Sequence, residues 1–229
     1  MHEPGRVPER STPPRGVITD WGGVMTNPIL ETVKAWLDAD GIDHSSYRTV
    51  MGRWVRAYGD AGDGSPIHAL ERGECTTEEF ERLLAAEIVR LDGDPVGPDG
   101  LLAKMFAGTV LSEPMQSLMR ELRSAGLRTA LLSNSWGLAD YPREVFPGLF
   151  DAVVLSAEVG MRKPEEQIFL HAAQLLGLRP QECVFIDDIE VNVTAAEAIG
   201  MVGVLHSDPA DSAARVRDLA GLDQGVRKA

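Results

Sequence analysis

Hydrophobic positions along the chain gather in short, unbroken runs, and polar residues or glycine follow each run. Unbroken runs of this length are typical of strands that a parallel sheet buries on both faces. We therefore expect buried parallel strands in the segments 16–20, 129–134, 151–156, 183–188 and 201–205.

Between these runs the apolar residues recur with the spacing of amphipathic helices. One helix is expected to begin after Ser112, its predicted N-cap, with Pro114 in the first turn. Another is expected to end at Gly177. The alternation of strands and helices from about residue 108 onward predicts a doubly wound α/β fold with a parallel sheet.

The segment between Asn27 and Gly108 shows helical periodicity and no strand-like run. Within it, "TTEE" at 76–79 places a threonine cap before acidic residues, which favours the start of a helix. We therefore predict an all-helical block inserted after the first strand. The predicted parts are a disordered tail at 1–14, an α/β core at 15–27 and 108–229, and a helical cap at 28–107.

Composition and charge narrow the classes of partner. The chain is 44% apolar and 25% charged, as in ordinary globular proteins. Its 35 acidic and 22 basic residues give a net charge of −13, which disfavours binding to a nucleic-acid backbone. One or two well-placed cations can still bind a small anionic substrate.

Targeting and redox signals favour a cytoplasmic location. Cys75 and Cys183 are far apart in the sequence, and two thiols predict neither a disulfide framework nor a cysteine-based zinc site. No segment approaches the roughly 18 apolar residues of a membrane span, and the proline-rich N-terminus lacks the pattern of a signal peptide. We expect a cytoplasmic protein without a membrane partner.

Polar side chains follow the predicted strands at the points where the strands end. They are Asp20, Ser133-Asn134 and Asp187-Asp188, with Lys163 on the loop after the run 151–156. Because ligands bind outside the carboxyl ends of parallel strands, these side chains are expected to converge at one edge of the sheet. Taken singly, each residue also fits an ordinary turn, cap or surface position, so it is their common placement that indicates a site.

The chemistry of this set fits phosphoryl transfer. Clustered carboxylates repel one another, and Mg²⁺ is a divalent cation that prefers oxygen ligands and substrate phosphate. An aspartate can attack phosphorus to give an acyl phosphate, which divides one difficult hydrolysis into two easier steps. A hydroxyl and an ammonium group would stabilise charge on the transferring oxygens.

Four segments resemble the motifs of the haloacid dehalogenase-like (HAD) superfamily, in the branch with a helical cap inserted after the first strand. They are "ITDWGGVMTN", "LLSNS", "SAEVGMRKPEEQIF" and "CVFIDDIEVNVTAAEAIGM". The resemblance covers roughly residues 15–206 and implies a Rossmann-like core. Within the superfamily, the chain is most similar to phosphatase-like members such as the N-terminal domain of soluble epoxide hydrolases.

The resemblance implies a role for each residue of the site. Asp20 would be the nucleophile, Ser133 the phosphate-binding hydroxyl, and Lys163 the cation that neutralises both. Mg²⁺ would be bound by Asp20, the carbonyl of Gly22, Asp188 and, directly or through water, Asp187. Asn192 would brace the loop that carries the acidic pair. Contacts to substrate or phosphate would come from Gly23, Asn134 and Trp21. Trp21 is expected to face the cap and shape substrate entry.

Gly22 departs from the family pattern, because most phosphatase members carry an aspartate at this position, two residues after the nucleophile. That acid protonates the leaving oxygen, and such proton transfer is typically worth 10²–10⁴-fold in rate. The chain would then be a slow phosphatase on a small phosphorylated metabolite, a haloacid dehalogenase-type hydrolase, or a non-catalytic protein that binds phosphate and metal. The acidic pair Asp187-Asp188 favours the first over the second.

Two further alternatives concern the fold and the cap. A phospho-receiver domain uses similar residues, but its acidic pair lies on the first strand, whereas here the pair comes last. The cap also offers side chains that would replace the missing acid or contact the substrate, although none is assigned. They are His44, Arg53, Arg56, Asp60, Asp63 and His68. The oligomeric state is not predicted.

Overall fold

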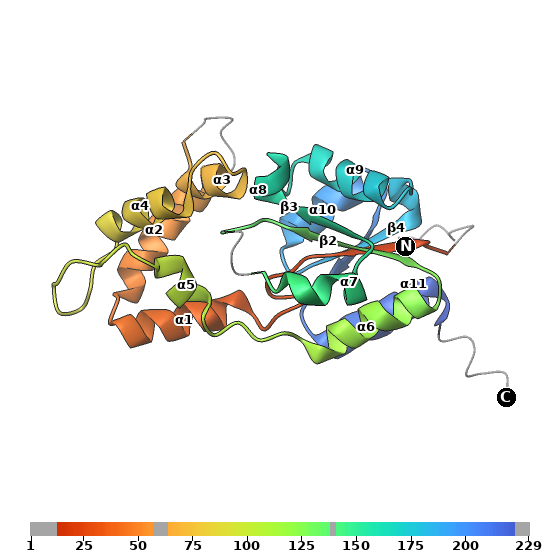
Figure 1. Cartoon of the computed structure of the whole chain (residues 1–229), viewed down its shortest axis with the longest axis horizontal. Helices are drawn as coiled ribbons and strands as arrows, with labels where there is room; N and C mark the ends of the chain where they lie inside the picture. Colours follow the sequence, from red (N-terminus) through yellow and green to blue (C-terminus); the bar gives the residue numbers. More distant parts are fainter. Residues whose placement is uncertain (1–12, 57–63, 138–140, 223–229) are drawn as a thin grey trace, which may run out of the picture.

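The computed structural model describes residues 13–56, 64–137 and 141–222, and its elements form two groups (Figure 1). One group is a parallel sheet with helices on both faces. The other is a set of helices that the chain forms between the first strand and α6 (Glu113–Ser124). The predicted fold class is therefore confirmed: an α/β core with helical segments inserted after its first strand.

The sheet has five strands within the described residues, all parallel, in the order β3-β2-β1-β4-β5. The strands are β1 (Gly16–Thr19), β2 (Arg128–Ser133), β3 (Ala152–Leu155), β4 (Cys183–Asp187) and β5 (Val202–Leu205). β1 lies at the centre, where Thr19 is in register with Leu131 on one side and Ile186 on the other. The ends of β1, β2 and β4 therefore lie next to one another.

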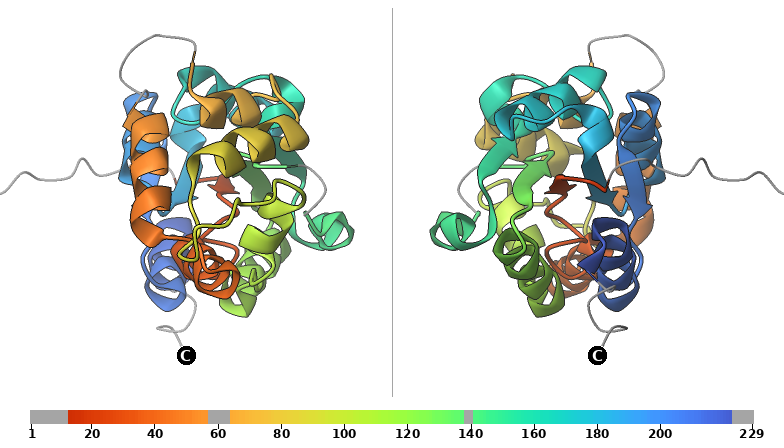
Figure 2. Two further views of the ribbon diagram at one scale, coloured as in Figure 1. Left: turned by 90° about the vertical axis from the view of Figure 1, so that its left-hand side faces the viewer. Right: turned by 90° about the vertical axis from the view of Figure 1, so that its right-hand side faces the viewer.

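Helices cover both faces of the sheet (Figure 2), which explains why most residues of the central strands are apolar and buried. On β1, Val17 belongs to a cluster with residues of α6 and α11 (Pro209–Ala220), and Ile18 belongs to a cluster with residues of α9 (Glu166–Leu175) and α10 (Glu190–Ala198). The core helices are α6, α7 (Phe146–Leu149), α8 (Ser156–Val159), α9 (Glu166–Leu175), α10 (Glu190–Ala198) and α11 (Pro209–Ala220), with 3-10 turns at Arg143–Val145 and Pro180–Glu182.

The predicted helix ends are found, with one difference in detail. Ser112 is the N-cap of α6 by position, but its side chain makes no capping hydrogen bond. Gly177 has a φ of 68°, the left-handed conformation that glycine adopts most easily at the end of a helix. Thr76 and Glu79 form a reciprocal capping box at the start of α4 (Thr77–Glu87), as the threonine and the following acids predict.

The inserted helices enclose a hydrophobic cluster of their own. They are α1 (Ile29–Asp40), α2 (His44–Arg56), α3 (Pro66–Glu71), α4 (Thr77–Glu87) and α5 (Leu101–Phe106). The chain leaves and re-enters the α/β part along adjacent segments, since Asn27 N–H donates to Val110 O at 2.9 Å. The division into domains at residues 27 and 108 stays a prediction, as does the disorder of the tail, of which residues 1–12 lie outside the described residues.

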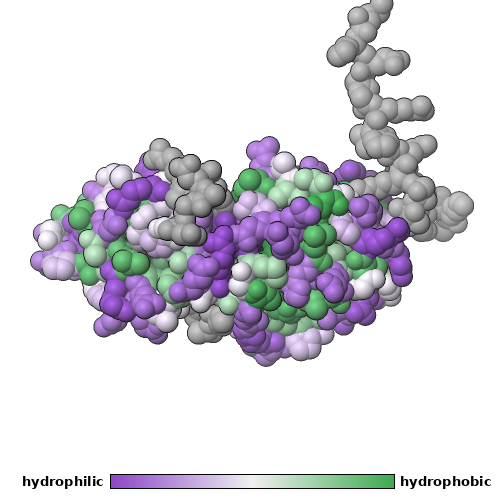
Figure 3. Space-filling view, turned by 90° about the horizontal axis from the view of Figure 1, so that it is seen from above, coloured by the Kyte–Doolittle hydropathy of each residue, from purple (hydrophilic) through white to green (hydrophobic). Residues whose placement is uncertain are grey.

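Hydrophilic residues spread over both groups of elements on the face shown in Figure 3, and apolar residues are interspersed among them. Among the described residues, none of the helices is both long enough and apolar enough to span a membrane. The Cys183 side chain is buried at the start of β4, within the apolar run of that strand.

Candidate active site

Three predicted residues meet in a buried ion-pair network at the carboxyl edge of the sheet. Asp20 follows β1 and Asp187 ends β4, while Lys163 lies on the loop after α8. The Lys163 Nζ atom is 2.7 Å from Asp20 Oδ1 and 2.6 Å from Asp187 Oδ2. The side chains of Lys163, Asp20 and Asp187 are 2%, 9% and 0% exposed. The ammonium group therefore lies between two carboxylates, shielded from bulk water.

Burial and charge act in opposite directions on this network. Loss of hydration raises the pKa of Asp20 to about 7, because this cost and the repulsion from Asp187 outweigh the attraction to Lys163. Burial alone would lower the pKa of Lys163, but attraction to Asp187 and Asp20 raises it above its ordinary value. Lys163 is therefore a permanent cation, whereas a further positive charge would favour the ionised form of Asp20.

Asp187 is held rigidly by hydrogen bonds from several directions. Its Oδ1 accepts from the backbone N–H of Ile189 at 2.8 Å, and the Asn192 side-chain amide donates to both carboxylate oxygens at 3.1 and 3.2 Å. With the bond from Lys163, these contacts occupy the four acceptor positions of a carboxylate. Asp187 thus anchors Lys163, and Asn192 lies where the bracing contact was predicted.

Three carboxylates lie close enough to hold a metal ion. One oxygen from each of Asp20, Asp187 and Asp188 lies within 4.8 Å of the others. Asp188 is exposed, and partial desolvation together with the charge of Asp187 raises its pKa. Gly23, with a φ of 79°, leaves room for it: a Cβ atom at Gly23 would lie 2.3 Å from Asp188 Oδ2. The backbone at this position therefore forms part of the cradle for the carboxylate.

Gly23 and Asn134 make hydrogen bonds within the protein, and their predicted contacts to phosphate stay a prediction. The Gly23 N–H donates to Thr26 Oγ1 at 3.0 Å, and this hydrogen bond stabilises the turn after Asp20. Asn134 clamps the neighbouring loop, because its side chain donates to Lys163 O at 3.0 Å and accepts from Lys163 N–H at 2.8 Å. Asn134 therefore positions the backbone of Lys163.

Ser133 lies at the end of β2 and is 3% exposed. Its Oγ atom is 2.8 Å from the hydroxyl of Tyr141, a residue that the sequence did not single out. Tyr141 belongs to the segment after β2, eight positions along the chain, and shares no motif with Ser133. The sequence carries no signal for this contact.

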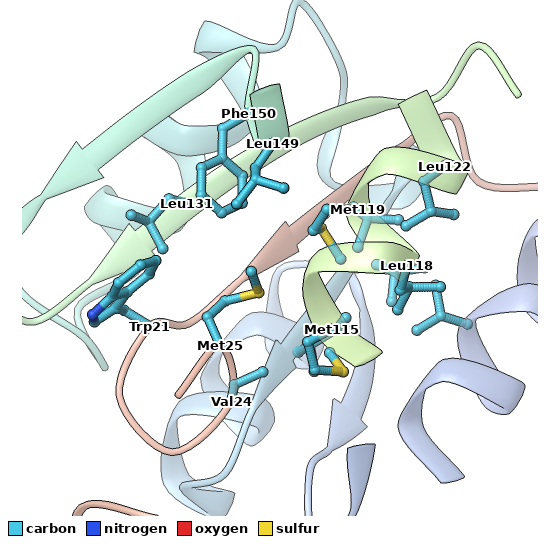
Figure 4. Close-up of a cluster of buried hydrophobic side chains, with 14 of the residues drawn as sticks. Trp21, Val24, Met25, Met115, Leu118, Met119, Leu122, Leu131, Leu149 and Phe150 are labelled. Atoms are coloured by element: carbon cyan, nitrogen blue, oxygen red, sulfur yellow. The ribbon is translucent and has the colours of Figure 1, made fainter. Parts of the chain in front are cut away.

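The expectation that Trp21 faces the cap is wrong. Its indole is buried in the core cluster on the α6 face of the sheet, near Leu131 (Figure 4). Its ring centroid lies 5.8 Å from that of Tyr141 and 5.5 Å from that of Phe146. Trp21 thus packs in the core beneath the turn that follows Asp20 and stabilises that turn.

Gly22 is next to the first residue of the inserted helices. A Cβ atom at Gly22 would lie 3.1 Å from Ile29 Cγ1 and 3.2 Å from Ile29 Cδ1. Its φ is outside the left-handed range that requires glycine, so the backbone would accept another residue. The side chain of Ile29 thus borders the position that the Cβ atom of an acid at position 22 would occupy.

The inserted helices contact the core beside the loops that carry Asn134 and Lys163. Trp136, directly after "SNS", packs against Phe80 and Phe106 with ring centroids 5.5 and 6.3 Å apart, and its indole N–H donates to Glu71 at 3.2 Å. Glu71 also pairs with Arg162, 2.6 Å away, where the two side chains are 6% and 4% exposed. Sequence analysis missed both contacts, although Arg162 directly precedes Lys163.

None of the candidate side chains on the inserted helices that the structure describes is placed to replace the missing acid at position 22. His44 pairs with Asp38 at 2.8 Å, and Arg53 with Glu87, both at exposed positions. Burial, with the charges of Arg162 and Arg72, lowers the pKa of His68 to about 4, so it is neutral near pH 7. Asp60, Asp63 and the side chain of Arg56 lie outside the described residues.

Comparisons with known proteins identify the family. The family model described as a haloacid dehalogenase-like hydrolase matches residues 14–200. The chain is 31% identical over 216 residues to acyl-CoA dehydrogenase family member 10 of Mus musculus, covering 91% of this chain and 19% of that protein. It is 28% identical over 214 residues to the sesquiterpene phosphatase astK of Aspergillus oryzae, covering 90% and 97% of the two chains.

The resemblance to soluble epoxide hydrolases is also confirmed. Bifunctional epoxide hydrolase 2 of Rattus norvegicus is 28% identical over 128 residues, which cover 53% of this chain and 23% of that protein. The chain thus spans about a fifth of the length of the mouse and rat relatives, at 19% and 23%.

A solved structure of similar fold is a HAD family enzyme of Bacteroides thetaiotaomicron. One of its structures, a complex with magnesium and inorganic phosphate, superposes with a TM-score of 0.57 at 22% identity, covering 84% of this chain and 94% of that chain. At this identity the likeness shows the fold alone.

Proposed function

Because the chain belongs to the haloacid dehalogenase-like hydrolase family, we propose that it is a Mg²⁺-dependent phosphatase that transfers the phosphoryl group of a small metabolite to Asp20. The observation that carries the proposal is the placement of Lys163 between Asp20 and Asp187, 2.7 and 2.6 Å from their oxygens, beside the carboxylate of Asp188. The relative from Aspergillus oryzae, a phosphatase by name, matches over nearly its whole length and supports this activity.

The residues at the edge of the sheet fit Mg²⁺. The three carboxylates are hard oxygen donors, and Gly23 leaves the space into which Asp188 extends. Since the acceptor positions of Asp187 are taken by Lys163, Asn192 and Ile189, we assign direct binding to Asp20 and Asp188 and an indirect role to Asp187. The carbonyl of Gly22 is a further candidate ligand. Bound Mg²⁺ would supply positive charge that favours ionised Asp20 and offsets the charge of the phosphoryl oxygens.

The chain's own residues would then perform the transfer. The Asp20 carboxylate attacks phosphorus and forms an acyl phosphate while the bond to the leaving oxygen breaks. Lys163 and the Ser133 hydroxyl donate hydrogen bonds to the transferring oxygens, where negative charge is concentrated. Water then attacks the acyl phosphate, releases inorganic phosphate and restores Asp20.

The test of metal dependence is hydrolysis of an activated aryl phosphate. We expect turnover with Mg²⁺ that chelator abolishes, and a rise in melting temperature on adding Mg²⁺, because bound metal stabilises the folded state by mass action. In Asp188→Asn the Mg²⁺ concentration for half-maximal activity should rise by about tenfold or more, since one carboxylate ligand is lost.

Asp211→Asn, on the exposed side of α11, is the matched control and should behave as wild type. Turnover that is indifferent to chelator would contradict the proposal.

Gly22 makes the rate depend on the leaving group. Without an acid at this position, leaving oxygens of low basicity, as in aryl phosphates, should be released much faster than alkoxides. Gly22→Asp is expected to raise kcat/KM for alkyl phosphates by about tenfold or more with little change for aryl phosphates. The side chain of Ile29 must shift by a few tenths of an ångström to admit it.

Gly22→Asn is the control for that gain, because asparagine has nearly the same shape but transfers no proton. The explanation from proton transfer predicts a gain for Asp alone, measured as kcat/KM on paired alkyl and aryl substrates. Equal effects of the two substitutions would contradict it.

A second candidate function is binding of metal and phosphate without turnover, and Gly22 is the observation that favours it. Under this alternative, Mg²⁺ and inorganic phosphate bind, but no phosphate ester in a broad panel is hydrolysed. The dehalogenase alternative is less well supported. The three carboxylates lie close enough to hold a metal ion, and the departure of a halide does not require one.

A further inference from the structure

Tyr141 combines an aromatic ring packed in the core with a hydroxyl at the phosphate site. Its ring centroid lies 5.8 Å from that of Trp21 and 6.3 Å from that of Phe146. These contacts hold the ring, and a phenylalanine would make them equally well. The hydroxyl does something different, because it lies 2.8 Å from Ser133 Oγ at the end of β2.

Ser133 has one proton to donate, and two oxygens would compete for it. In the structure, either Ser133 or Tyr141 can be the donor in their hydrogen bond. Ionised phosphoryl oxygens only accept hydrogen bonds, so Ser133 contributes to binding when its proton points toward the phosphoryl group. This requires that Tyr141 donate to Ser133 Oγ.

We propose that Tyr141 is a positioning residue, whose hydroxyl donates to Ser133 and thereby directs the Ser133 proton to the transferring phosphoryl group. The inference rests on the proposed function, since it takes Ser133 as a phosphoryl ligand. Tyr141 acts through Ser133 and need not touch the substrate.

The environment keeps Tyr141 in the form that donates. Burial raises the pKa of the Tyr141 phenol above its ordinary value, and the nearby charge of Asp20 acts in the same direction, whereas the hydrogen bond with Ser133 and the charge of Lys163 act against it. The phenol is therefore neutral at physiological pH. A chain of two hydroxyls, from Tyr141 through Ser133, fixes the direction of both protons once an anion accepts the second.

A double-mutant cycle on Tyr141 and Ser133 tests the proposal. Tyr141→Phe keeps the ring and removes the hydroxyl, and it should weaken binding of inorganic phosphate in the presence of Mg²⁺ by about three- to tenfold. The same loss should appear in kcat/KM for an aryl phosphate. In a Ser133→Ala background, Tyr141→Phe should change neither quantity, because the group through which Tyr141 acts is gone.

Tyr47→Phe is the matched control, since Tyr47 is a second partly buried tyrosine, packed on Trp36 in the inserted helices. It should leave phosphate affinity unchanged. An unchanged affinity in Tyr141→Phe, or an equal loss in the Ser133→Ala background, would overturn the proposal. Melting temperatures of all variants separate these outcomes from unfolding.

Phosphate affinity and kcat/KM together distinguish failure of this proposal from failure of the proposed function. If the wild-type chain binds phosphate but hydrolyses no ester, the proposed function fails, and the cycle in phosphate affinity still decides the role of Tyr141. If the wild-type chain binds no phosphate with Mg²⁺ present, there is no phosphoryl group to orient, and the role of Tyr141 is rejected as well.

Discussion

Asp20→Asn is expected to lower kcat for an activated aryl phosphate by about 10⁴-fold or more, because the asparagine amide is not a nucleophile and no acyl phosphate forms. The substitution preserves size and shape, and Lys163 keeps its bond to Asp187 at 2.6 Å. The loss should therefore appear in kcat, measured at saturating substrate and Mg²⁺. Residual turnover near the wild-type rate would contradict the mechanism.

The same variant should not be less stable than wild type at pH 8. Since the folded chain raises the pKa of Asp20 to about 7, the folded state binds more protons than the unfolded state between about pH 4 and 7. The contribution of Asp20 to stability therefore falls as pH rises through this window. Asparagine has no charge to bury, so thermal unfolding with chelator at pH 8 should give an equal or higher melting temperature.

Lys163→Met is expected to affect both stability and turnover. It leaves Asp20 and Asp187 buried side by side without their shared cation, and loss of one partner from a buried pair costs about 3–5 kcal/mol. For a domain of this size, that corresponds to a fall of about 10 °C in melting temperature. Turnover should fall by about 10²–10³-fold as well, because a donor to the phosphoryl oxygens is removed.

Lys104→Met provides the matched control for stability, since the pair of Lys104 with Asp40 is largely exposed and exposed pairs contribute little. Lys163→Arg retains the charge and should fold better than Lys163→Met, which separates loss of activity from loss of fold. A melting temperature of Lys163→Met equal to that of wild type, measured in chelator, would contradict the account of the network.

The elements of the core could be predicted because the physics that places them is local. Strands buried on both faces need unbroken apolar runs, so each strand is visible in the sequence. Parallel strands end at a common edge, so residues at the ends of the runs meet there. The convergence of Asp20 and Asp187 follows from these two facts. Lys163 was expected beside them because its loop follows the run 151–156 at the same edge of the sheet.

Side-chain directions in the loops could not be predicted in the same way. After Asp20 the chain makes a tight turn, in which Met25 N–H donates to Trp21 O at 2.9 Å, and this turn carries the indole of Trp21 into the core. Asn134 contacts Lys163 because the loops that follow β2 and β3 are neighbours in space. Neither orientation is encoded by residue type or spacing.

The contacts between the inserted helices and the core are also invisible in the sequence. Glu71 and Arg162 are 91 positions apart, and each alone resembles a solvated surface residue. Only the packing of α3 beside the Lys163 loop makes them a buried pair. Tyr141 was missed for a related reason. Its aromatic ring alone predicts a core position, and the contact of its hydroxyl with Ser133 can be seen only in the folded structure.

The central claim is that the phosphoryl group passes through Asp20, and trapping the acyl phosphate tests it most directly. Wild-type chain is mixed with an aryl phosphate and Mg²⁺, quenched in acid within a turnover, and digested for peptide mapping by mass spectrometry. The account predicts one phosphoryl group on the peptide that contains Asp20, absent in Asp20→Asn. A phosphoryl group on another residue, or full turnover by Asp20→Asn, would contradict it.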